Sequence, residues 1–319
     1  MKLDVVLISY NQEHYIAQAV ESILMQRVNG DAQVRVIVAD DCSSDGTLDI
    51  IKSYEERSPF PFVYLSAEKN MGVAANYKRA FETTEADYVA VMEGDDWWID
   101  ANRLQKHLNY LSTHSSCVLT KNSYLQYSQR GGKYSVEQSN YDVLTLSQSL
   151  RDYVMANMSA TVFRGDLVRH MDDMVYEFGH ALCREATDVF THLYLLQFGD
   201  GYVLNDVMSV YRVDTGENIS LINRTNEELL DRAQLRYQYS VALLGEKYHE
   251  DAFTYVVETQ ELVAQNRKNK KYQVLANYIP PFLARLFVYG APNLAYNVKS
   301  ALRKCIPNMI YRVIRRKQV

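Results

Sequence analysis

An apolar segment that ends at a cluster of acids is the feature that most constrains this chain. Residues 88–92 are short, apolar throughout and rich in valine, which is typical of a strand buried on both faces of a parallel sheet. Glu93, Asp95 and Asp96 follow directly. Because ligands bind at the carboxyl ends of parallel strands, the sequence predicts an open α/β sheet with an acidic site at this edge.

The three acids indicate a divalent cation. Carboxylates this close repel one another in a low-dielectric cleft unless a cation or hydrogen-bond donors compensate their charge. Mg²⁺ and Mn²⁺ prefer oxygen ligands, and Mg²⁺ usually binds one or two protein carboxylates, with water and substrate phosphate completing its shell. A substrate that carries a diphosphate is therefore indicated. The alternative is that Asp95 and Asp96 only cap the next helix, expected over residues 103–113.

Three strand-then-helix units precede this fourth strand. The expected strands cover residues 3–9, 34–39 and 62–65, and the expected helices cover residues 14–26, 47–54 and 73–83. Such a succession describes half of an open α/β sheet that binds a nucleotide.

The turns after the first two strands narrow the choice of nucleotide. Residues 9–13 contain no glycine, so the glycine-rich turn of dinucleotide enzymes, and that of a sugar nucleotidyltransferase, is absent from this position. After the second strand, residues 43–45 suffice to cap the following helix, which leaves Asp40 and Asp41 unexplained. A carboxylate there could accept the imide N–H of a uracil ring, and Tyr10 could lie against the base.

Four short motifs together resemble the inverting, metal-dependent glycosyltransferases of family 2, which have the GT-A fold. The motifs are residues 8–11 (Ile-Ser-Tyr-Asn), 40–47 (Asp-Asp-Cys-Ser-Ser-Asp-Gly-Thr), 70–72 (Asn-Met-Gly) and 93–96 (Glu-Gly-Asp-Asp), and the resemblance covers roughly residues 3–220. It implies that Asp41 contacts the nucleobase, and that Asp95 and Asp96 hold the donor and Mn²⁺ or Mg²⁺, with Asp96 as the direct metal ligand. The family usually has Asp at the place of Glu93 and Gly at the place of Cys42.

The second half is expected to receive the acceptor. Residues 117–127 and 160–163 have strand character, with a hairpin turn at residues 131–132, and an apolar helix over 189–198 precedes a strand over 202–212. The resemblance implies that Asp188, ahead of this helix, is the general base that takes the proton of the acceptor hydroxyl, with Glu185 as the second candidate. The alternative for Asp188 is an acid that only stabilises the helix N-terminus.

Three further side chains are candidates for substrate contacts. Arg212 is a candidate for the donor diphosphate, although the family often has His where Asp214 stands. Trp97 and Trp98 are candidates for stacking on an acceptor sugar, and either could instead belong to the core.

Cysteine usage and charge suggest where the protein works. The four cysteines have no CxxC spacing, and the sequence has neither a signal-peptide pattern nor an apolar segment of the ~20 residues that cross a membrane. We therefore expect a cytoplasmic protein. Twelve Lys or Arg residues follow Glu261, which is the last acid, so the tail from Leu262 could dock on the inner face of the cell membrane or pack as a basic helix.

These observations predict an α/β GT-A fold, a Rossmann-like mixed sheet flanked by helices, with a C-terminal helical extension. The expected domains are a catalytic domain over 1–221, made of a donor half (1–114) and an acceptor half (115–221), and a basic extension over 222–319. The expected activity is inverting transfer of a sugar from a nucleoside-diphosphate donor, a UDP-sugar, to a hydroxyl of a glycan or lipid-linked glycan in surface polysaccharide biosynthesis. The alternatives are a sugar nucleotidyltransferase and a catalytically silent nucleotide-sugar-binding module; no nucleic-acid partner is expected.

Overall fold

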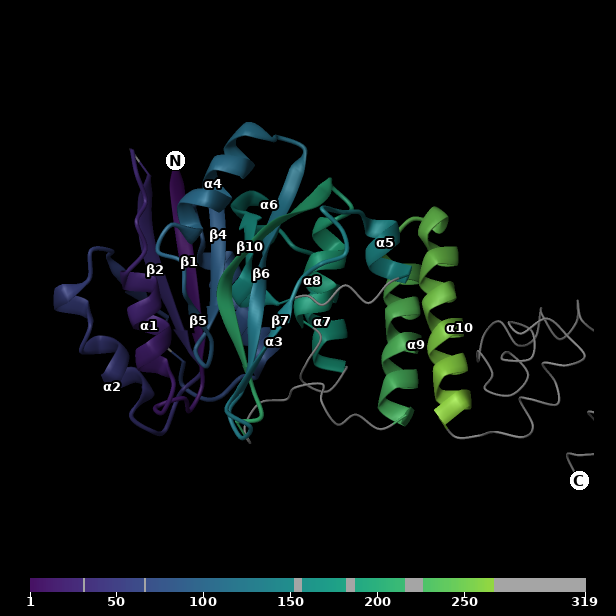
Figure 1. Cartoon of the computed structure of the whole chain (residues 1–319), viewed down its shortest axis with the longest axis horizontal. Coiled ribbons are helices and arrows are strands. Elements are labelled where there is room, and N and C mark those ends of the chain that lie inside the picture. The colour runs from purple at the N-terminus through teal and green to yellow at the C-terminus, as the bar shows by residue number, and fades with distance from the viewer. Residues whose placement is uncertain (31, 66, 152–156, 182–186, 216–225, 267–319) are drawn as a thin grey trace, which may run out of the picture. The chain divides into compact units, whose positions relative to one another are not determined.

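The expected donor half is built on four parallel strands whose carboxyl ends meet at one edge. The computed structural model describes residues 1–266 except 31, 66, 152–156, 182–186 and 216–225 (Figure 1). The strands lie in the order β3-β2-β1-β4, and Ser9 pairs with Asp40 while Ile8 pairs with Glu93. Their bounds are Lys2–Ser9 (β1), Gln33–Asp40 (β2), Phe62–Tyr64 (β3) and Tyr88–Glu93 (β4).

The same sheet continues into the expected acceptor half. Strand β9 (Thr161–Arg164) lies antiparallel between β4 and β6 (Cys117–Ser128), and β6 lies parallel to β10 (Asp200–Val213). Strands β5 (Trp97–Trp98) and β8 (Val143–Leu144) pair antiparallel with β10, and β7 (Lys133–Glu137) forms a hairpin with β6. The predicted mixed sheet flanked by helices is confirmed, and so is the predicted hairpin.

Helices cover both faces of this sheet. Helices α1 (Ile16–Leu24), α2 (Thr47–Lys52) and α4 (Arg103–Thr113) share a core cluster with alternate residues of β1, β2 and β4. On the other face lie α3 (Val73–Thr83), α6 (Gly165–Arg169) and α8 (Thr187–Leu195), with α7 (Asp173–Ala181) against α3 and α8. The short helices α5 (Leu146–Arg151), η1 (Glu55–Arg57) and η2 (Met158–Ala160) complete this part of the chain.

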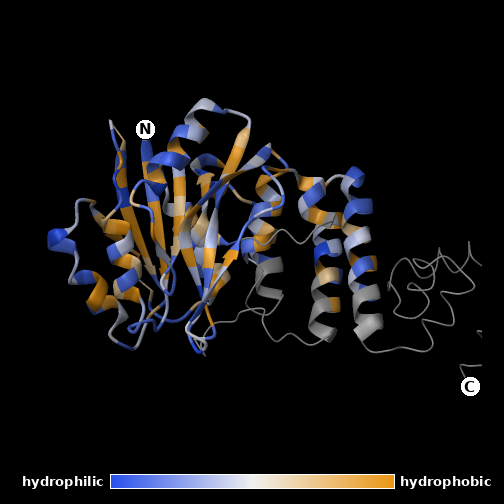
Figure 2. Ribbon diagram, in the orientation of Figure 1, coloured by the Kyte–Doolittle hydropathy of each residue, from blue (hydrophilic) through white to orange (hydrophobic). Residues whose placement is uncertain are grey.

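Burial on both faces explains why the strands are continuously apolar. Val5, Val6 and Leu7 are all fully buried in β1, although successive side chains point to opposite faces of the sheet. The strands of the central sheet stand out as hydrophobic in Figure 2. Each such side chain contributes roughly 1.5–3 kcal/mol by leaving water, so a charge placed at one of these positions would disrupt the sheet.

One alternative for the acids is wrong. The helix predicted over residues 103–113 is α4, with both ends confirmed, and its N-cap is Asn102. Asp95 and Asp96 precede β5, which separates them from α4, so they do not cap it.

The chain divides into two compact units. One comprises Met1–Asn223 and Tyr239–Tyr248, and the other comprises Arg224–Gln238 and His249–Val319. The expected functional boundaries after residues 114 and 221 stay predictions, although strands from both sides of residue 114 share one sheet.

The predicted C-terminal helices are present. They are α9 (Asn226–Leu243), with η4 (Glu246–Tyr248) after it, and α10 (His249–Asn266). In the second unit, the Arg236 guanidinium lies 4.5 Å from the ring centre of Tyr255. None of the helices described here has the length and apolarity needed to cross a membrane. Residues 267–319, which carry the basic tail, lie outside the described residues.

Candidate active site

Reciprocal hydrogen bonds join the loops that follow β1 and β2. The backbone N–H of Asn11 donates to Ser43 Oγ (2.9 Å), and that of Glu13 donates to Asp45 Oδ2 (3.0 Å). In return, the N–H of Gly46 donates to Glu13 Oε2 (2.9 Å). These bonds leave Tyr10 at the surface, 45% exposed, where its ring is accessible to a base. Its donor contact stays a prediction.

Asp40 and Asp41 are both buried, but they hold different parts of the chain. Asp40 accepts hydrogen bonds from the hydroxyls of Ser9 and Ser43, and it closes the turn after β2. Asp41 accepts the backbone N–H groups of Met71 and Gly72, both at 2.9 Å, and thereby positions the loop before α3. An ionised carboxylate has about four lone-pair sites, so these two bonds leave Asp41 capacity to accept a base N–H. Donor contacts by Asp40 and Asp41 stay predictions.

Glycine at position 94 brings the acidic turn against α1. A Cβ atom there would lie 2.2 Å from Gln12 Oε1 and 2.7 Å from Ile16 Cδ1. The turn is fixed further because the N–H of Gly94 donates to the carbonyl of Ile8 and the N–H of Asp96 donates to the carbonyl of Glu93, both at 2.9 Å. The three acids are therefore held on one tight turn at the carboxyl end of β4.

Asp96 is a fully buried acid with one free oxygen. Its Oδ1 accepts the backbone N–H of Arg212 (2.9 Å), whereas its Oδ2 has no hydrogen-bond partner. Burial, followed by the negative charges of Asp95 and Glu93, raises the pKa of Asp96 well above its usual value. Such an environment disfavours the carboxylate unless positive charge is supplied.

These acids fit a divalent cation. Within the described part of the chain, no group of three or more His, Cys, Asp or Glu side chains is arranged as a complete metal cage. The partnerless oxygen of Asp96 and the excess of buried negative charge suit instead a cation that takes one or two protein carboxylates and completes its shell with water and phosphate. Asp96 and Asp95 are the residues that would hold it.

Glu93, which stands where the family usually has Asp, belongs to the same acidic turn. The Tyr77 hydroxyl donates to Glu93 Oε1 (2.9 Å), and the N–H of Glu93 donates to Ser159 Oγ (3.0 Å). Burial, together with the charges of Asp95 and Asp188, raises the pKa of Glu93 to about 8. Tyr77 was missed altogether. Its position on the helix after the Asn-Met-Gly motif is the sequence signal that could have indicated it.

Asp188 faces this acid cluster from the opposite half of the sequence. Its negative charge raises the pKa of Glu93, and it also contributes to the raised pKa values of Tyr77 and Tyr211. Asp188 lies in the first turn of α8, where its Oδ1 accepts the N–H of Val189 (2.7 Å). The structure thus brings Asp188 to the acids after β4. Its place in the first turn of α8 is also one where an acid stabilises the N-terminus of a helix. Its role as general base stays a prediction, and Glu185 lies outside the described residues.

Arg212 connects the acidic turn to the surrounding loops. Its Nε donates to the carbonyl of Asp95 (2.7 Å), and its two terminal nitrogens donate to Gln129 Oε1 and Gln18 Oε1, both at 2.6 Å. The guanidinium also lies 4.5 Å from the ring centre of Trp97. Arg212 is therefore buried within the site and positions its turn, while a contact to the donor diphosphate stays a prediction.

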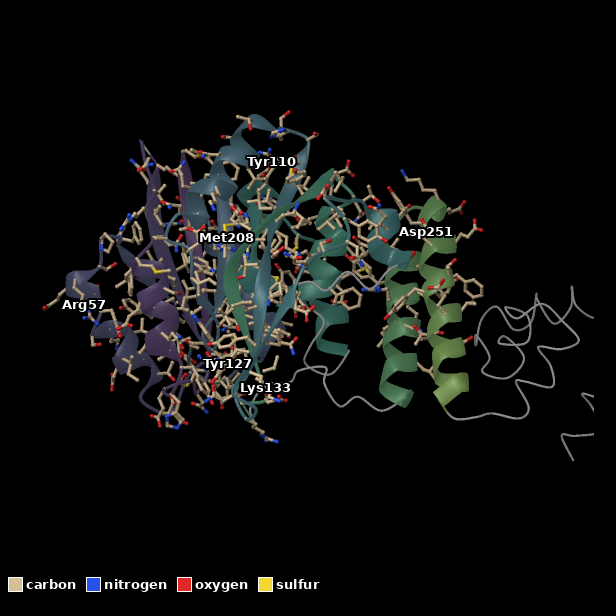
Figure 3. All side chains as sticks on the ribbon, viewed as in Figure 1. Arg57, Tyr110, Tyr127, Lys133, Met208 and Asp251 are labelled. Atoms are coloured by element: carbon tan, nitrogen blue, oxygen red, sulfur yellow. The ribbon has the colours of Figure 1, made fainter. Side chains whose placement is uncertain are left out.

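The two tryptophans lie in the interior. Trp98 is 1% exposed, belongs to the core cluster, and donates its Nε1–H to the carbonyl of Ser159 (2.7 Å). Trp97 is 8% exposed, and its ring meets Tyr127 edge-on with centroids 5.9 Å apart. Tyr127 lies at the end of the strands opposite to Tyr110 (Figure 3). This burial favours the core alternative for Trp98, and acceptor stacking by either ring stays a prediction.

Comparison with known proteins agrees with this arrangement. The sequence model described as Glycosyl transferase family 2 matches residues 4–156. Among curated proteins, the chain is 28% identical over 213 residues to the putative teichuronic acid biosynthesis glycosyltransferase TuaG of Bacillus subtilis, covering 66% of this chain and 79% of that protein. It is 41% identical over 112 residues to the uncharacterized protein Rv1520 of Mycobacterium tuberculosis, covering 35% of this chain and about a third (32%) of that relative.

A solved structure supports the fold. Residues 1–349 of S. aureus TarS in complex with UDP-GlcNAc superpose with a TM-score of 0.63 at 21% identity, over 90% of this chain and 80% of that one. Both the GT-A fold and the family resemblance indicated by the motifs are confirmed. Over residues 4–156, just under half of its length, the chain matches glycosyl transferase family 2.

Proposed function

We propose that this protein is an inverting, metal-dependent glycosyltransferase that moves a sugar from a UDP-sugar to a hydroxyl of a glycan or lipid-linked glycan in surface polysaccharide biosynthesis. One observation carries the proposal: the acids after β4 and Asp188 of α8 face the same site although they lie far apart in the sequence. A nucleotide-sugar reaction that inverts the anomeric carbon needs both a group for the diphosphate and a base on the acceptor side.

The proposed chemistry assigns the proton to Asp188. As the acceptor oxygen forms its bond to the anomeric carbon, the hydroxyl proton passes to the Asp188 carboxylate. The bond from that carbon to the diphosphate oxygen breaks on the opposite face, so UDP leaves with the bonding electrons. Asp95 and Asp96 would hold the cation, which when bound supplies positive charge to the leaving diphosphate. Arg212 and Gly94 keep the acidic turn in place.

The relatives support the choice of donor and pathway. The TarS structure contains UDP-GlcNAc, and the name of TuaG refers to teichuronic acid biosynthesis. Because the identity to TarS is low and the alignment spans only part of several relatives, a uridine donor and a surface polysaccharide acceptor are proposals for this chain.

The proposal is tested by incubating the full chain with a panel of nucleoside-diphosphate sugars and Mn²⁺, with and without extracted glycans, and following nucleoside diphosphate release. We expect turnover with a UDP-sugar, accelerated by an acceptor. A sugar nucleotidyltransferase would instead form a nucleotide-sugar from a nucleoside triphosphate and a sugar phosphate. A silent binding module would bind UDP without turnover of any donor, and that result would overturn the proposal.

Two variants separate the proposed roles. Asp96→Ala should weaken UDP binding and activity together, because the diphosphate would then meet Asp95 and Glu93 without a properly held cation. Asp188→Asn should retain UDP binding while the rate falls on the order of 10²- to 10⁴-fold, the usual effect of losing a general base. Calorimetry with UDP and Mn²⁺ checks both, and equal loss of binding in the two variants would contradict this division.

A peripheral membrane location is a separate proposal that rests on the sequence alone. The tail after Glu261 has twelve basic residues and no acid. At about 1 kcal/mol per basic residue near an anionic leaflet, a few engaged residues would give useful binding. Co-sedimentation at low salt with anionic and with neutral liposomes, for the full chain and for one that ends at Glu261, tests it. If the full chain does not co-sediment with anionic vesicles, this proposal is excluded.

A further inference from the structure

Lys121 is a buried lysine that the proposed mechanism does not use. It lies in β6, in the middle of the sheet, where its backbone pairs with Thr161 of β9 and Val203 of β10. The residue is only 6% exposed. Lysine is almost never this buried unless opposite charge accompanies it.

Contacts place Lys121 beside the start of α8. Its strand neighbour Thr161 has its Oγ1 3.2 Å from His192 Nε2, and His192 Nδ1 lies 2.7 Å from the carbonyl oxygen of Asp188. The Lys121 ammonium also lies 5.5 Å from the ring centre of Tyr124. Lys121 is therefore held on the face of the sheet that α8 covers, the face from which Asp188 approaches the site.

The electrostatic couplings agree with this placement. Burial lowers the pKa of Lys121 to about 8, while the charges of Glu137 and Asp188 act in the opposite direction. The positive charge of Lys121 in turn helps to lower the pKa of His192. Lys121 and Asp188 thus interact electrostatically within a buried region, where charge–charge interactions are stronger than in water.

We propose that Lys121 is a positioning residue for the general base, and that its ammonium group keeps the Asp188 carboxylate ionised and directed toward the acceptor hydroxyl. This inference rests on the proposed function of Asp188. The reason for such a residue is that Asp188 is half-buried beside Glu93, since burial and a nearby like charge both favour a protonated carboxyl, and a protonated Asp188 could not accept a proton. The titratable groups that face Asp188 or Lys121 are Glu93 (β4), Tyr77 (α3), Tyr211 (β10), His192 (α8) and Glu137 (β7).

The first test is a pH–rate profile of UDP release from the UDP-sugar that is turned over, with water or glycan as acceptor. Lys121→Met removes the charge but fills the space, and Lys121→Arg retains the charge. Lys106→Met is the matched control, because Lys106 is also paired with acids (Asp100 and Asp206) but belongs to α4.

We expect the acid limb of the Lys121→Met profile to move upward by about one pH unit, so that at pH values below the pKa of the base the rate falls by up to about tenfold. Well above that pKa, where the base is ionised in both proteins, the rates should converge within about threefold. Lys121→Arg should retain the wild-type profile, and UDP affinity should be unchanged in all variants. A loss that is equal at every pH, or the same change in Lys106→Met, would assign Lys121 a structural role only.

The second test does not depend on activity. In protein labelled with [6-¹³C]lysine, the Lys121 signal is identified by its absence in Lys121→Arg and is titrated in the wild type and in Asp188→Asn. We expect the pKa of Lys121 to fall by about one unit when the Asp188 charge is removed. An unchanged titration alongside normal donor turnover would overturn the inference alone. A clear coupling without turnover of any donor would overturn the proposed function, and the role of Lys121 with it.

Discussion

Asp96→Asn should make the ligand-free protein more stable while it abolishes most of the activity. The substitution retains the shape of the side chain and the oxygen that accepts the N–H of Arg212. It removes a titratable group whose second oxygen is buried without a partner and whose ionisation is opposed by burial and by the charges of Asp95 and Glu93. A new amide group would instead offer hydrogen-bond donors to a region of excess negative charge.

The magnitude follows from the burial of Asp96. Leaving a buried polar group unsatisfied costs about 1–3 kcal/mol, and more when the group is charged. Part of this cost is removed in Asp96→Asn, so we expect its free energy of unfolding to be higher than that of the wild type by about 1–2 kcal/mol. For a domain of this size, each kcal/mol raises the Tm by about 2–4 °C, which gives an increase of about 2–8 °C.

Thermal melting with and without Mn²⁺ and UDP checks this prediction. At ligand concentrations of about 100 Kd, binding should stabilise the wild type by about 2.7 kcal/mol, whereas Asp96→Asn should gain much less. Asp100→Asn is the control, because the Asp100 carboxylate accepts from Lys106 Nζ (2.9 Å) and from the N–H of Asn102 (2.8 Å), so its loss should lower the Tm. A lower Tm for Asp96→Asn, or a ligand response equal to that of the wild type, would refute the reasoning.

Three other changes have expected outcomes. Burial lowers the pKa of His192 to about 4, so as the pH falls below ~6.5 the unfolded chain takes up a proton before the folded chain does. Up to about 3 kcal/mol of folding stability is therefore lost between pH ~6.5 and pH ~4. In denaturant melts across this pH range, the stability of His192→Gln should change less with pH than that of the wild type. Cys42 has a left-handed backbone conformation, with φ 62°, which costs a non-glycine residue about 1–2 kcal/mol. Glycine avoids this cost but loses more backbone entropy on folding, so Cys42→Gly should raise the free energy of unfolding by up to ~1 kcal/mol, as measured by urea titration. Arg212→Lys should reduce the free energy of unfolding by about 1–2 kcal/mol and so lower the Tm by several degrees. The reason is that an ammonium group cannot replace the planar guanidinium, whose nitrogens donate to three separate groups. An unchanged Tm would exclude the positioning role of Arg212.

Hydrophobic periodicity predicted most of the fold because both faces of the sheet are covered. The four strands of the expected donor half and α4 lie where the sequence placed them. The helix expected over residues 14–26 is shorter, because Gln12 accepts the N–H groups of Tyr15 and Ile16 in a turn and α1 begins only at Ile16. The insertion of β9 between β4 and β6 could not be predicted, since this pairing joins segments about 40 to 75 residues apart and no local pattern specifies it.

From the residues alone, the site was predictable only where its members are adjacent in sequence, whereas Asp188 was indicated by the family resemblance. The acids after β4 are neighbours, so their repulsion and the need for a cation follow from the chain itself. Residues 120–123 of β6 (Thr-Lys-Asn-Ser) are polar without interruption, a pattern that by itself suggests a solvent-exposed strand, yet none of them is more than 6% exposed. On one face of the sheet, Thr120 and Asn122 contact His107 of α4. On the other face, the charge of Asp188 acts on Lys121. A buried strand retains polar side chains chiefly where they have partners, although Ser123 Oγ has no hydrogen-bond partner among the described residues. An uninterrupted polar segment in the middle of a covered sheet therefore indicates a functional site, but only after the sheet is known to be covered.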